Sequence, residues 1–385
     1  MSRLRGRLLV DGRLAEGALE IEDGRIKTIE IGPSPEDAGD LPIVAPGLVD
    51  LHVHGFGGCD PLEDLAGMAR ALALAGTTSF QPTLFPREPG ALGAEAARVA
   101  RAAEELARSA EDAAAAVGLH LEGPFVNPLR AGALPKDAIA EPSREALRAI
   151  LGPASGSGRG VRTMTLAPEL PGAAELVEEL ARSGIRASLG HSDATAAEAR
   201  AAARAGAQGA THLFNAMRPL HHREAGLAGF ALSGAALYAE LIGDLVHVGP
   251  EAVALALAAR GPGGLCLVSD ALPGAGTGCE VFHWHGREHL VRDGAAWYRD
   301  PEDGEPRLTG SALGQLEMVR RLVQRGVIGL AEALAMASET PARALGLERE
   351  IGRLAPGARA DLILLDPLTL ELREVRIQGR RVARA

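Results

Sequence analysis

The chain has 385 residues, with 40 Lys and Arg against 50 Asp and Glu, and a net charge of -10 at pH 7. This negative charge disfavours nucleic acids and anionic membranes as partners. Three cysteines, Cys59, Cys266 and Cys279, are too few for a disulfide framework, and neither a signal-peptide core nor a membrane-spanning apolar run is present. We therefore expect a soluble cytoplasmic protein with no nucleic-acid or membrane partner.

Both ends of the chain have the pattern of short strands joined by tight turns. Asp11-Gly12 and Asp23-Gly24 separate apolar runs near the N-terminus, and Gln378-Gly379 does so near the C-terminus. Residues 1–46 and 355–385 are therefore predicted to form one small β-sandwich domain.

Between these ends, apolar runs alternate with amphipathic stretches rich in Ala and Leu. About eight strand–helix alternations over residues 47–354 predict an α/β fold with a (β/α)8 TIM-like barrel. Active sites of such barrels lie at the C-terminal ends of the strands. Polar residues that end the apolar runs are therefore the site candidates.

The first of these runs ends in "VDLHVHG", with His52 and His54 two residues apart. Alternate residues of a strand share a face, so both imidazoles point to one side. Neutral imidazole is a common ligand of zinc and related ions. The pair does not identify a metal site by itself, and becomes a metal-site prediction only with partners elsewhere in the chain. Cys59, close by, is interpreted as a small buried thiol.

Further metal-type ligands end later runs. Glu122 lies in "LHLEG", His191 in "LGHS" and His212 in "THLF". A buried carboxylate is costly unless it is paired or bound to a metal, so these three residues are predicted to hold a divalent ion. A second ion would use His52 and His54, with Glu122 shared. We expect one or two ions per subunit, with zinc favoured and Fe, Mn, Co and Ni left open, because these ligands suit several divalent ions.

Asp270 ends the strongly apolar run "LCLVSD". One interpretation is an N-cap of the next helix. The other is catalytic: near a metal, a carboxylate accepts the proton of the attacking water and returns it to the leaving nitrogen. The latter explains better why the other strand ends also carry ligand-type residues.

Candidate anion contacts are Arg223 in "HHREAG", His247 in "DLVHV" and the backbone at Asn215 and Ala216. A further H-x-H motif occurs in "VFHWHGREH", at His283 and His285, with His289 nearby; this segment is interpreted as a surface hairpin.

Taken together, these motifs resemble the N-acetylglucosamine-6-phosphate deacetylases of the amidohydrolase superfamily. The similarity runs nearly end to end and is carried by "APGLVDLHVHG", "HLEGPFVNP", "GHSDAT", "THLFNAM", "SDALPGAG" and "GRLAPGARADLILLD". It implies a TIM-like barrel, metal binding by Glu122, His191 and His212, and Asp270 as the catalytic acid/base. The implied substrate contacts are Ala133, Asn215, Ala216, Arg223, His247, Leu308, Thr309 and Gly310.

The resemblance also implies a reaction and an assembly. The reaction is hydrolysis of N-acetyl-D-glucosamine 6-phosphate to D-glucosamine 6-phosphate and acetate, in amino-sugar catabolism and recycling. The only small-molecule partner implied is therefore a sugar phosphate. The assembly is a homodimer in which the segment around Arg223 reaches the neighbouring site.

One departure leaves the substrate open. The family usually continues "KKGAH" after its Glu-Gly-Pro motif, whereas this chain has "LRAGALPKD", which puts Leu134 where a His polarises the amide carbonyl. An amidohydrolase acting on a different N-acyl sugar or a cyclic amide is therefore an alternative. A non-enzymatic sugar-phosphate-binding scaffold is a second alternative, which the complete set of metal-type residues disfavours.

Overall fold

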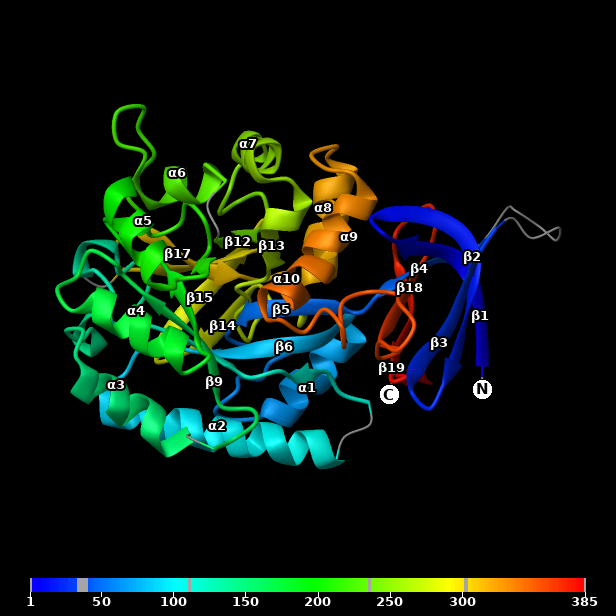
Figure 1. Ribbon diagram of the computed structural model, residues 1–385, viewed down its shortest axis with the longest axis horizontal. Coiled ribbons are helices and arrows are strands. Elements are labelled where there is room, and N and C mark those ends of the chain that lie inside the picture. Colours follow the sequence, from blue (N-terminus) through cyan, green and yellow to red (C-terminus); the bar gives the residue numbers. More distant parts are fainter. Residues whose placement is uncertain are drawn as a thin grey trace.

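The computed structural model describes residues 2–32, 41–109, 112–154, 156–234, 237–300 and 304–383. Figure 1 shows a large barrel and, beside it, a smaller sheet in which the first and last strands of the chain lie together. Within the described residues, no helix is long and apolar enough to cross a membrane.

The barrel consists of eight parallel strands, each paired with its neighbours in chain order. They are β5 (Leu48–Val53), β6 (Thr77–Leu84), β8 (Leu119–Glu122), β9 (Val161–Leu166), β10 (Arg186–Leu189), β11 (Gly209–Ala210), β12 (Tyr238–Ile242) and β13 (Leu265–Val268), with the short β7 (Ala115–Ala116) beside β6. The backbone N–H of Asp270 donates to the carbonyl of His52 at 2.8 Å, so the end of β13 returns to β5 and the ring closes. The predicted (β/α)8 barrel is confirmed.

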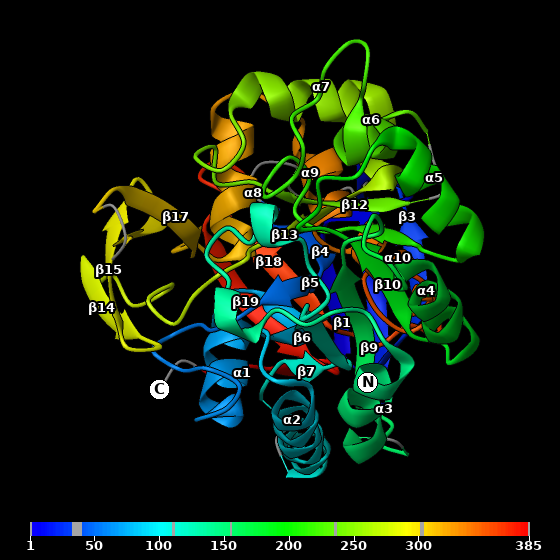
Figure 2. The same cartoon turned by 90° about the vertical axis from the view of Figure 1, so that its left-hand side faces the viewer.

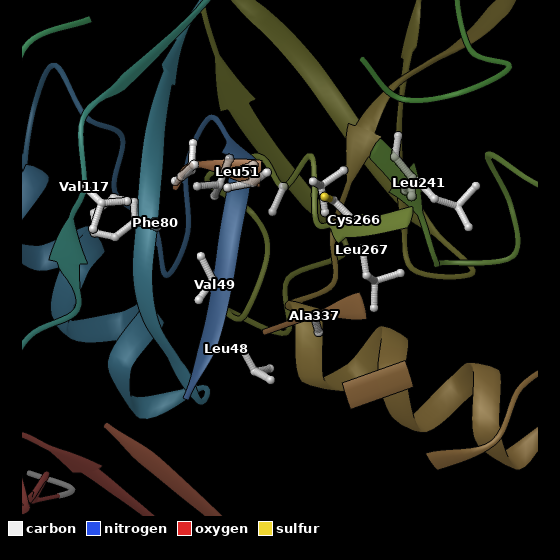
Figure 3. Close-up of a cluster of buried hydrophobic side chains, with 14 of the residues drawn as sticks. Leu48, Val49, Leu51, Phe80, Val117, Leu241, Cys266, Leu267 and Ala337 are labelled. Carbon is white, nitrogen blue, oxygen red and sulfur yellow. The ribbon is translucent and has the colours of Figure 1, made fainter. Parts of the chain in front are cut away.

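The barrel strands are buried on both faces, which is why they read as nearly continuous apolar runs. Every residue of β6 is buried, including Phe80. Figure 3 shows Phe80, Leu51 and Leu267 among the side chains that fill the core between the strands and the surrounding helices. The polar ends of the same strands are thereby held on a rigid frame.

Helices surround the barrel. They are α1 (Leu65–Leu74), α2 (Pro89–Ser109), α3 (Arg144–Leu151), α4 (Ala173–Arg182), α5 (Ala196–Ala205), α6 (Gly226–Leu232), α7 (Pro250–Arg260), α8 (Gln315–Gln324), α9 (Leu330–Met336) and α10 (Glu339–Ala344). Helix α5 illustrates how the sequence sets their ends. Thr195 and Glu198 form a capping box at its start, and Gly206 ends it with a φ of 115°.

The terminal strands form one sheet in the order β20-β19-β18-β4-β1-β2-β3. Their bounds are β1 (Ser2–Val10), β2 (Arg13–Glu22), β3 (Arg25–Ile31), β4 (Ile43–Pro46), β18 (Leu362–Leu365), β19 (Leu372–Ile377) and β20 (Arg380–Arg381). The predicted turn at Asp11-Gly12 is present, with φ angles of 48° and 73°. Leu8, Leu19 and Leu362 pack in a core separate from that of the barrel.

A third sheet is inserted between β13 and α8. It contains β14 (Val281–Trp284), β15 (Arg287–Arg292), β16 (Ala295–Arg299) and β17 (Pro306–Ser311), all antiparallel, and is called the inserted sheet below. Figure 2 shows it standing at one side of the barrel. It is tied to the strand ends because Ser311 N donates to Asp270 O at 2.8 Å.

Candidate active site

Four barrel strands bring the predicted metal ligands together. His52 lies in β5, Glu122 ends β8, and His191 and His212 each follow their strands by two residues. Glu122 Oε1 lies 3.0 Å from the Nε2 atoms of both His191 and His212. Its other oxygen, Oε2, lies 3.2 Å from His54 Nε2. Glu122 thus stands between two pairs of histidines, all of them buried.

Sharp backbone turns place these side chains. His191, His212 and Asp270 have φ angles of 47°, 29° and 48°, in the left-handed region that non-glycine residues rarely occupy. Each turn comes directly after its barrel strand, so the side chain is directed over the barrel mouth. Such strain persists only where the surroundings enforce it, and it concentrates at functional sites.

The electrostatics of the cluster favour a cation at its centre. Burial raises the pKa of Glu122, but His52, His191 and His212 outweigh it and hold that pKa well below its ordinary value. Burial likewise lowers the pKa of His212, yet the Glu122 carboxylate raises it above the ordinary value. An ionised carboxylate in contact with several imidazoles therefore attracts positive charge, either protons or a metal ion.

The donor atoms also fit a divalent ion. Glu122, His191 and His212 form one group, and His52, His54 and Glu122 another, with ligand atoms all within 4.8 Å of one another in each group. Imidazole nitrogen and carboxylate oxygen are the donors that zinc and its neighbours accept. Cys59 does not belong to either group; its Sγ faces Asp64 Oδ2 at 3.7 Å.

Asp270 faces this cluster. Its Oδ1 lies 3.5 Å from Nε2 of both His52 and His54. The interpretation of Asp270 as a helix N-cap is wrong, because the next helix of the structure, α8, begins at Gln315. The carboxylate instead lines the space over the cluster.

A cavity of about 160 Å³ opens over the cluster. Of the predicted substrate contacts, its lining includes Ala133, Asn215, Ala216, His247, Leu308 and Thr309. Leu134 also lines this catalytic pocket and is only 4% exposed, so an apolar side chain occupies the wall where the resemblance implies a histidine.

Two predicted substrate contacts do not line the pocket. Gly310 lies behind Asp270: a Cβ added there would stand 2.6 Å from the Asp270 carbonyl oxygen, so the position requires glycine for close backbone packing. Arg223 is exposed, and its guanidinium contacts the ring of His222 at 3.0 Å. Within one chain, the structure does not bring Arg223 to the pocket.

Two buried carboxylates that hold site histidines were not predicted from the sequence. Asp244 Oδ2 lies 2.6 Å from His247 Nδ1, which leaves His247 Nε2 for a ligand. Glu240 Oε2 lies 3.3 Å from His52 Nδ1. Burial opposes ionisation of Glu240, but His52, His120 and Arg186 lower its pKa to about 2. The available signals were the D-x-x-H spacing of "DLVH" and an acidic residue inside the apolar run "YAELI".

The interpretation of "VFHWHGREH" as a surface hairpin is correct in part. The hairpin is formed by β14 and β15, and the His283 side chain is 74% exposed. His289, however, is only 1% exposed, and Trp284 donates from Nε1 to Asp60 at 3.1 Å. The surface assignment is therefore wrong for His289 and for Trp284, because the inserted sheet packs this face against the barrel mouth.

Comparison with known proteins identifies the family. The model of the amidohydrolase family matches residues 43–382. The chain belongs to the amidohydrolase family. The resemblance inferred from the sequence motifs is therefore confirmed.

Relatives within the family match over almost their full length. N-acetylglucosamine-6-phosphate deacetylase of Bacillus subtilis is 35% identical over 364 residues, which cover 91% of this chain and 89% of that protein. N-acetylgalactosamine-6-phosphate deacetylase of Escherichia coli is 33% identical over 382 residues, 98% of each chain. A mutant N-acetyl-D-glucosamine-6-phosphate deacetylase of Mycobacterium smegmatis, solved with N-acetyl-D-glucosamine-6-phosphate, superposes with a TM-score of 0.87 at 32% identity and covers 99% of both chains.

Proposed function

We propose that this amidohydrolase removes the acetyl group of N-acetyl-D-glucosamine 6-phosphate, giving D-glucosamine 6-phosphate and acetate in amino-sugar catabolism. The observation that carries the proposal is the position of Asp270 against the cluster of Glu122, His52 and His54, at the mouth of a pocket. The names of the Bacillus subtilis and Escherichia coli relatives, both sugar-phosphate deacetylases, support the same type of reaction.

Pocket residues away from the cluster would orient the sugar phosphate. Asp244 accepts from the backbone N–H groups of Val246 and His247 as well as facing the His247 ring, so that ring has a fixed direction. His247 and Asn215 would donate to the phosphate. Binding energy collected there positions the amide against the reacting groups.

The reaction is a proton relay through Asp270. Its carboxylate would accept a proton from the attacking water, and the resulting acid would donate that proton to the amine as the C–N bond breaks. A divalent ion held by Glu122, His191 and His212 would supply Lewis-acid activation of the water and the carbonyl. Because the Leu134 side chain has no hydrogen-bond donor, it cannot donate to the amide carbonyl as a histidine at this position would.

The remaining assignments follow from the resemblance and the donor set. We propose zinc as the ion, with iron, manganese, cobalt and nickel as substitutes, and one or two ions per subunit. We propose a cytoplasmic homodimer in which the exposed Arg223 contacts the phosphate bound in the neighbouring subunit. Light scattering of the purified protein measures the assembly, and elemental analysis measures the ion.

The direct test is release of acetate by purified, metal-loaded protein. We expect turnover of N-acetyl-D-glucosamine 6-phosphate, much slower turnover of the unphosphorylated sugar, and loss of about 10²- to 10⁴-fold in kcat in Asp270→Asn, which lacks the proton acceptor. No acetate from either sugar would overturn the assignment. Equal rates for both would remove phosphate recognition from it.

N-acetyl-D-galactosamine 6-phosphate is a second candidate substrate. The Escherichia coli relative named for that activity matches 98% of this chain, at nearly the same identity as the Bacillus subtilis relative. The two sugars differ only in the configuration at C4. Comparing kcat/KM for the two epimers in the same acetate assay decides between them.

A further inference from the structure

A second cavity adjoins the catalytic pocket, between the barrel mouth and the inserted sheet. This second cavity has a volume of about 120 Å³. Phe85, Ala133 and Thr309 line both spaces, whereas Trp284, His285 and Arg287 line only the second. The proposed reaction requires the catalytic pocket alone.

The second cavity lies across the metal-type cluster from the proposed phosphate contacts. Phe85 directly follows β6, and its ring centroid is 4.2 Å from that of His54 and 5.1 Å from that of Trp284. Asn215 follows β11, which lies four strands from β6 in the ring of eight. Strands four apart in an eight-stranded barrel stand on opposite sides. The cluster thus separates the phosphate side from the second cavity.

This arrangement decides which part of a substrate meets the second cavity. In an N-acyl amino sugar, the carbonyl carbon joins the sugar nitrogen on one side to the acyl chain on the other. With the carbonyl at the cluster and the sugar phosphate beside Asn215, the acyl chain is directed toward Phe85. This step rests on the function proposed above.

The residues of the second cavity combine aromatic surface with an available cation. The Arg287 guanidinium carbon lies 4.8 Å from the centroid of the Tyr298 ring, and its Nη1 donates to the Ala133 carbonyl at 3.5 Å. Within the described part of the chain, no carboxylate lies within ion-pairing distance of Arg287. Arg87 also lines this cavity, but its Nε already pairs with Glu95 Oε1 at 3.6 Å. The planar fork of an arginine suits a carboxylate.

We propose that the second cavity is an acyl subsite, and that the chain hydrolyses amino-sugar phosphates whose N-acyl group is longer than acetyl and ends in a carboxylate. The methylene groups would pack on Phe85 and Trp284, and the carboxylate would pair with Arg287. For an N-succinyl substrate, water adds to the carbonyl carbon and the C–N bond breaks. The amine leaves with the proton that it receives through Asp270, and succinate is released.

The test compares three substrates on the purified, metal-loaded protein: N-acetyl-, N-butyryl- and N-succinyl-glucosamine 6-phosphate. Butyryl and succinyl chains have the same number of carbons, so their ratio of kcat/KM isolates the terminal carboxylate. We expect N-succinyl to be preferred over N-butyryl by about tenfold or more, because a charge-assisted hydrogen bond is worth that much. The preference should disappear in Arg287→Met and persist in part in Arg287→Lys.

The matched control is Arg292→Met, the same change at an exposed position of the same strand. It should keep the wild-type preference for N-succinyl. A readout without turnover is the shift in thermal midpoint caused by free succinate, which should be larger for the wild type than for Arg287→Met.

The outcomes separate the two proposals. Turnover of N-acetyl without turnover of N-succinyl overturns the acyl subsite and leaves the deacetylase intact. Equal kcat/KM for N-butyryl and N-succinyl, unchanged in Arg287→Met, overturns the pairing with Arg287. No turnover of any of the three overturns both.

Discussion

Glu240 connects two buried basic residues inside the barrel. Its two oxygens face His52 Nδ1 and Arg186 Nη1, each at 3.3 Å, and none of the three residues is more than 3% exposed. An ionised carboxylate at that distance holds a proton on Nδ1 of His52. The Nε2 atom, which faces His54 and Glu122, is then free to bind an ion. Carboxylates behind histidine ligands act in this way at many metal sites.

We predict that Glu240→Gln weakens metal binding by about 10- to 100-fold, the usual effect of removing such a partner. The amide keeps the shape of the side chain but loses its charge, so it no longer fixes the proton on Nδ1. Competition with a chromophoric chelator measures the affinity directly. Glu251→Gln, at an exposed position of α7, is the control and should bind metal as the wild type does. Unchanged affinity in Glu240→Gln would contradict this role.

Gly310 acts on the site through its backbone. A Cβ at this position would lie 2.6 Å from Asp270 O and 3.1 Å from Leu272 Cγ, and a backbone oxygen cannot move away without moving Asp270 itself. Asp270 O also accepts the Ser311 N–H at 2.8 Å, so the added methyl group would disturb this contact between β17 and the strand end.

We expect Gly310→Ala to lower the free energy of unfolding by about 1–3 kcal/mol, as overpacking does. Because a misplacement of about 1 Å costs about 10²-fold in rate, kcat should fall more than stability alone explains. Denaturant unfolding and the acetate assay measure the two effects. Gly158→Ala is the matched control, since a Cβ there meets nothing within 4 Å. If Gly310→Ala matches this control in both unfolding free energy and kcat, the close contact with Asp270 affects neither stability nor activity.

At the level of elements, the residues at the strand ends were predictable from the sequence, but the side chains that hold those residues in place were not. Apolar runs that end in Glu122, His191 and Asp270 identify both the strands and the residues at the barrel mouth. The contacts of Asp244 with His247 and of Glu240 with His52 were not predicted. They depend on the directions in which the side chains point, which strand positions alone do not give. Arg223 illustrates the opposite limit: its motif predicted a substrate contact, but within one chain the residue does not line the pocket.

The inserted sheet was predictable only as a hairpin. Its polar sequence resembles a solvated surface, but His289 is buried and its ring stacks on Phe282 with centroids 4.9 Å apart. Burial is the main cause that lowers the pKa of His289 from 6.5 to about 4. The unfolded chain therefore binds a proton between these pH values that the folded chain does not. The contribution of this residue to stability is complete above pH 6.5 and is lost as pH falls toward 4.

We predict that the free energy of unfolding decreases less between pH 7 and pH 5 in His289→Gln than in the wild type. Glutamine has no proton to bind in this range, so the variant lacks that part of the pH dependence, whatever its stability at pH 7. Denaturant unfolding at both pH values measures the difference. His283→Gln, at an exposed position on the same hairpin, should keep the wild-type dependence. Identical dependence in all three proteins would show that folding leaves the pKa of His289 unchanged.

At the level of the whole molecule, the periodicity of the sequence predicted the barrel architecture more firmly than it predicted the limits of the domains. The alternation of apolar and amphipathic stretches is repeated eight times, so single errors do not change the barrel prediction. The domain limits at residues 46 and 355 stay a prediction. β4 (Ile43–Pro46) pairs within the terminal sheet, and the barrel strand β5 begins only two residues later. No linker therefore marks a boundary between the two.

The metal-type cluster joins four of the eight barrel strands, β5, β8, β10 and β11, so ion binding should stabilise the barrel as a whole. An ion that binds only the folded chain adds RT ln(1 + [L]/Kd), or about 4 kcal/mol at a free concentration 1,000 times Kd. We predict that removing the ion with a chelator lowers the thermal midpoint of the wild type and that adding zinc restores it. Calorimetry before and after chelation measures the change.

Glu122→Gln is the variant that tests this explanation. Glu122 belongs to both ligand groups, so its loss should remove most of the effect of chelator and zinc on the midpoint. Glu105→Gln, at an exposed position of α2, should respond as the wild type does. A chelator effect of equal size in Glu122→Gln would mean that the stabilising ion binds elsewhere. A wild type that does not respond to chelator, after elemental analysis has shown a bound ion, would mean that the barrel is equally stable without it. An equal chelator effect in Glu122→Gln would show that Glu122 is not a ligand of the stabilising ion. A wild type that does not respond would show that the bound ion does not contribute to the stability of the fold.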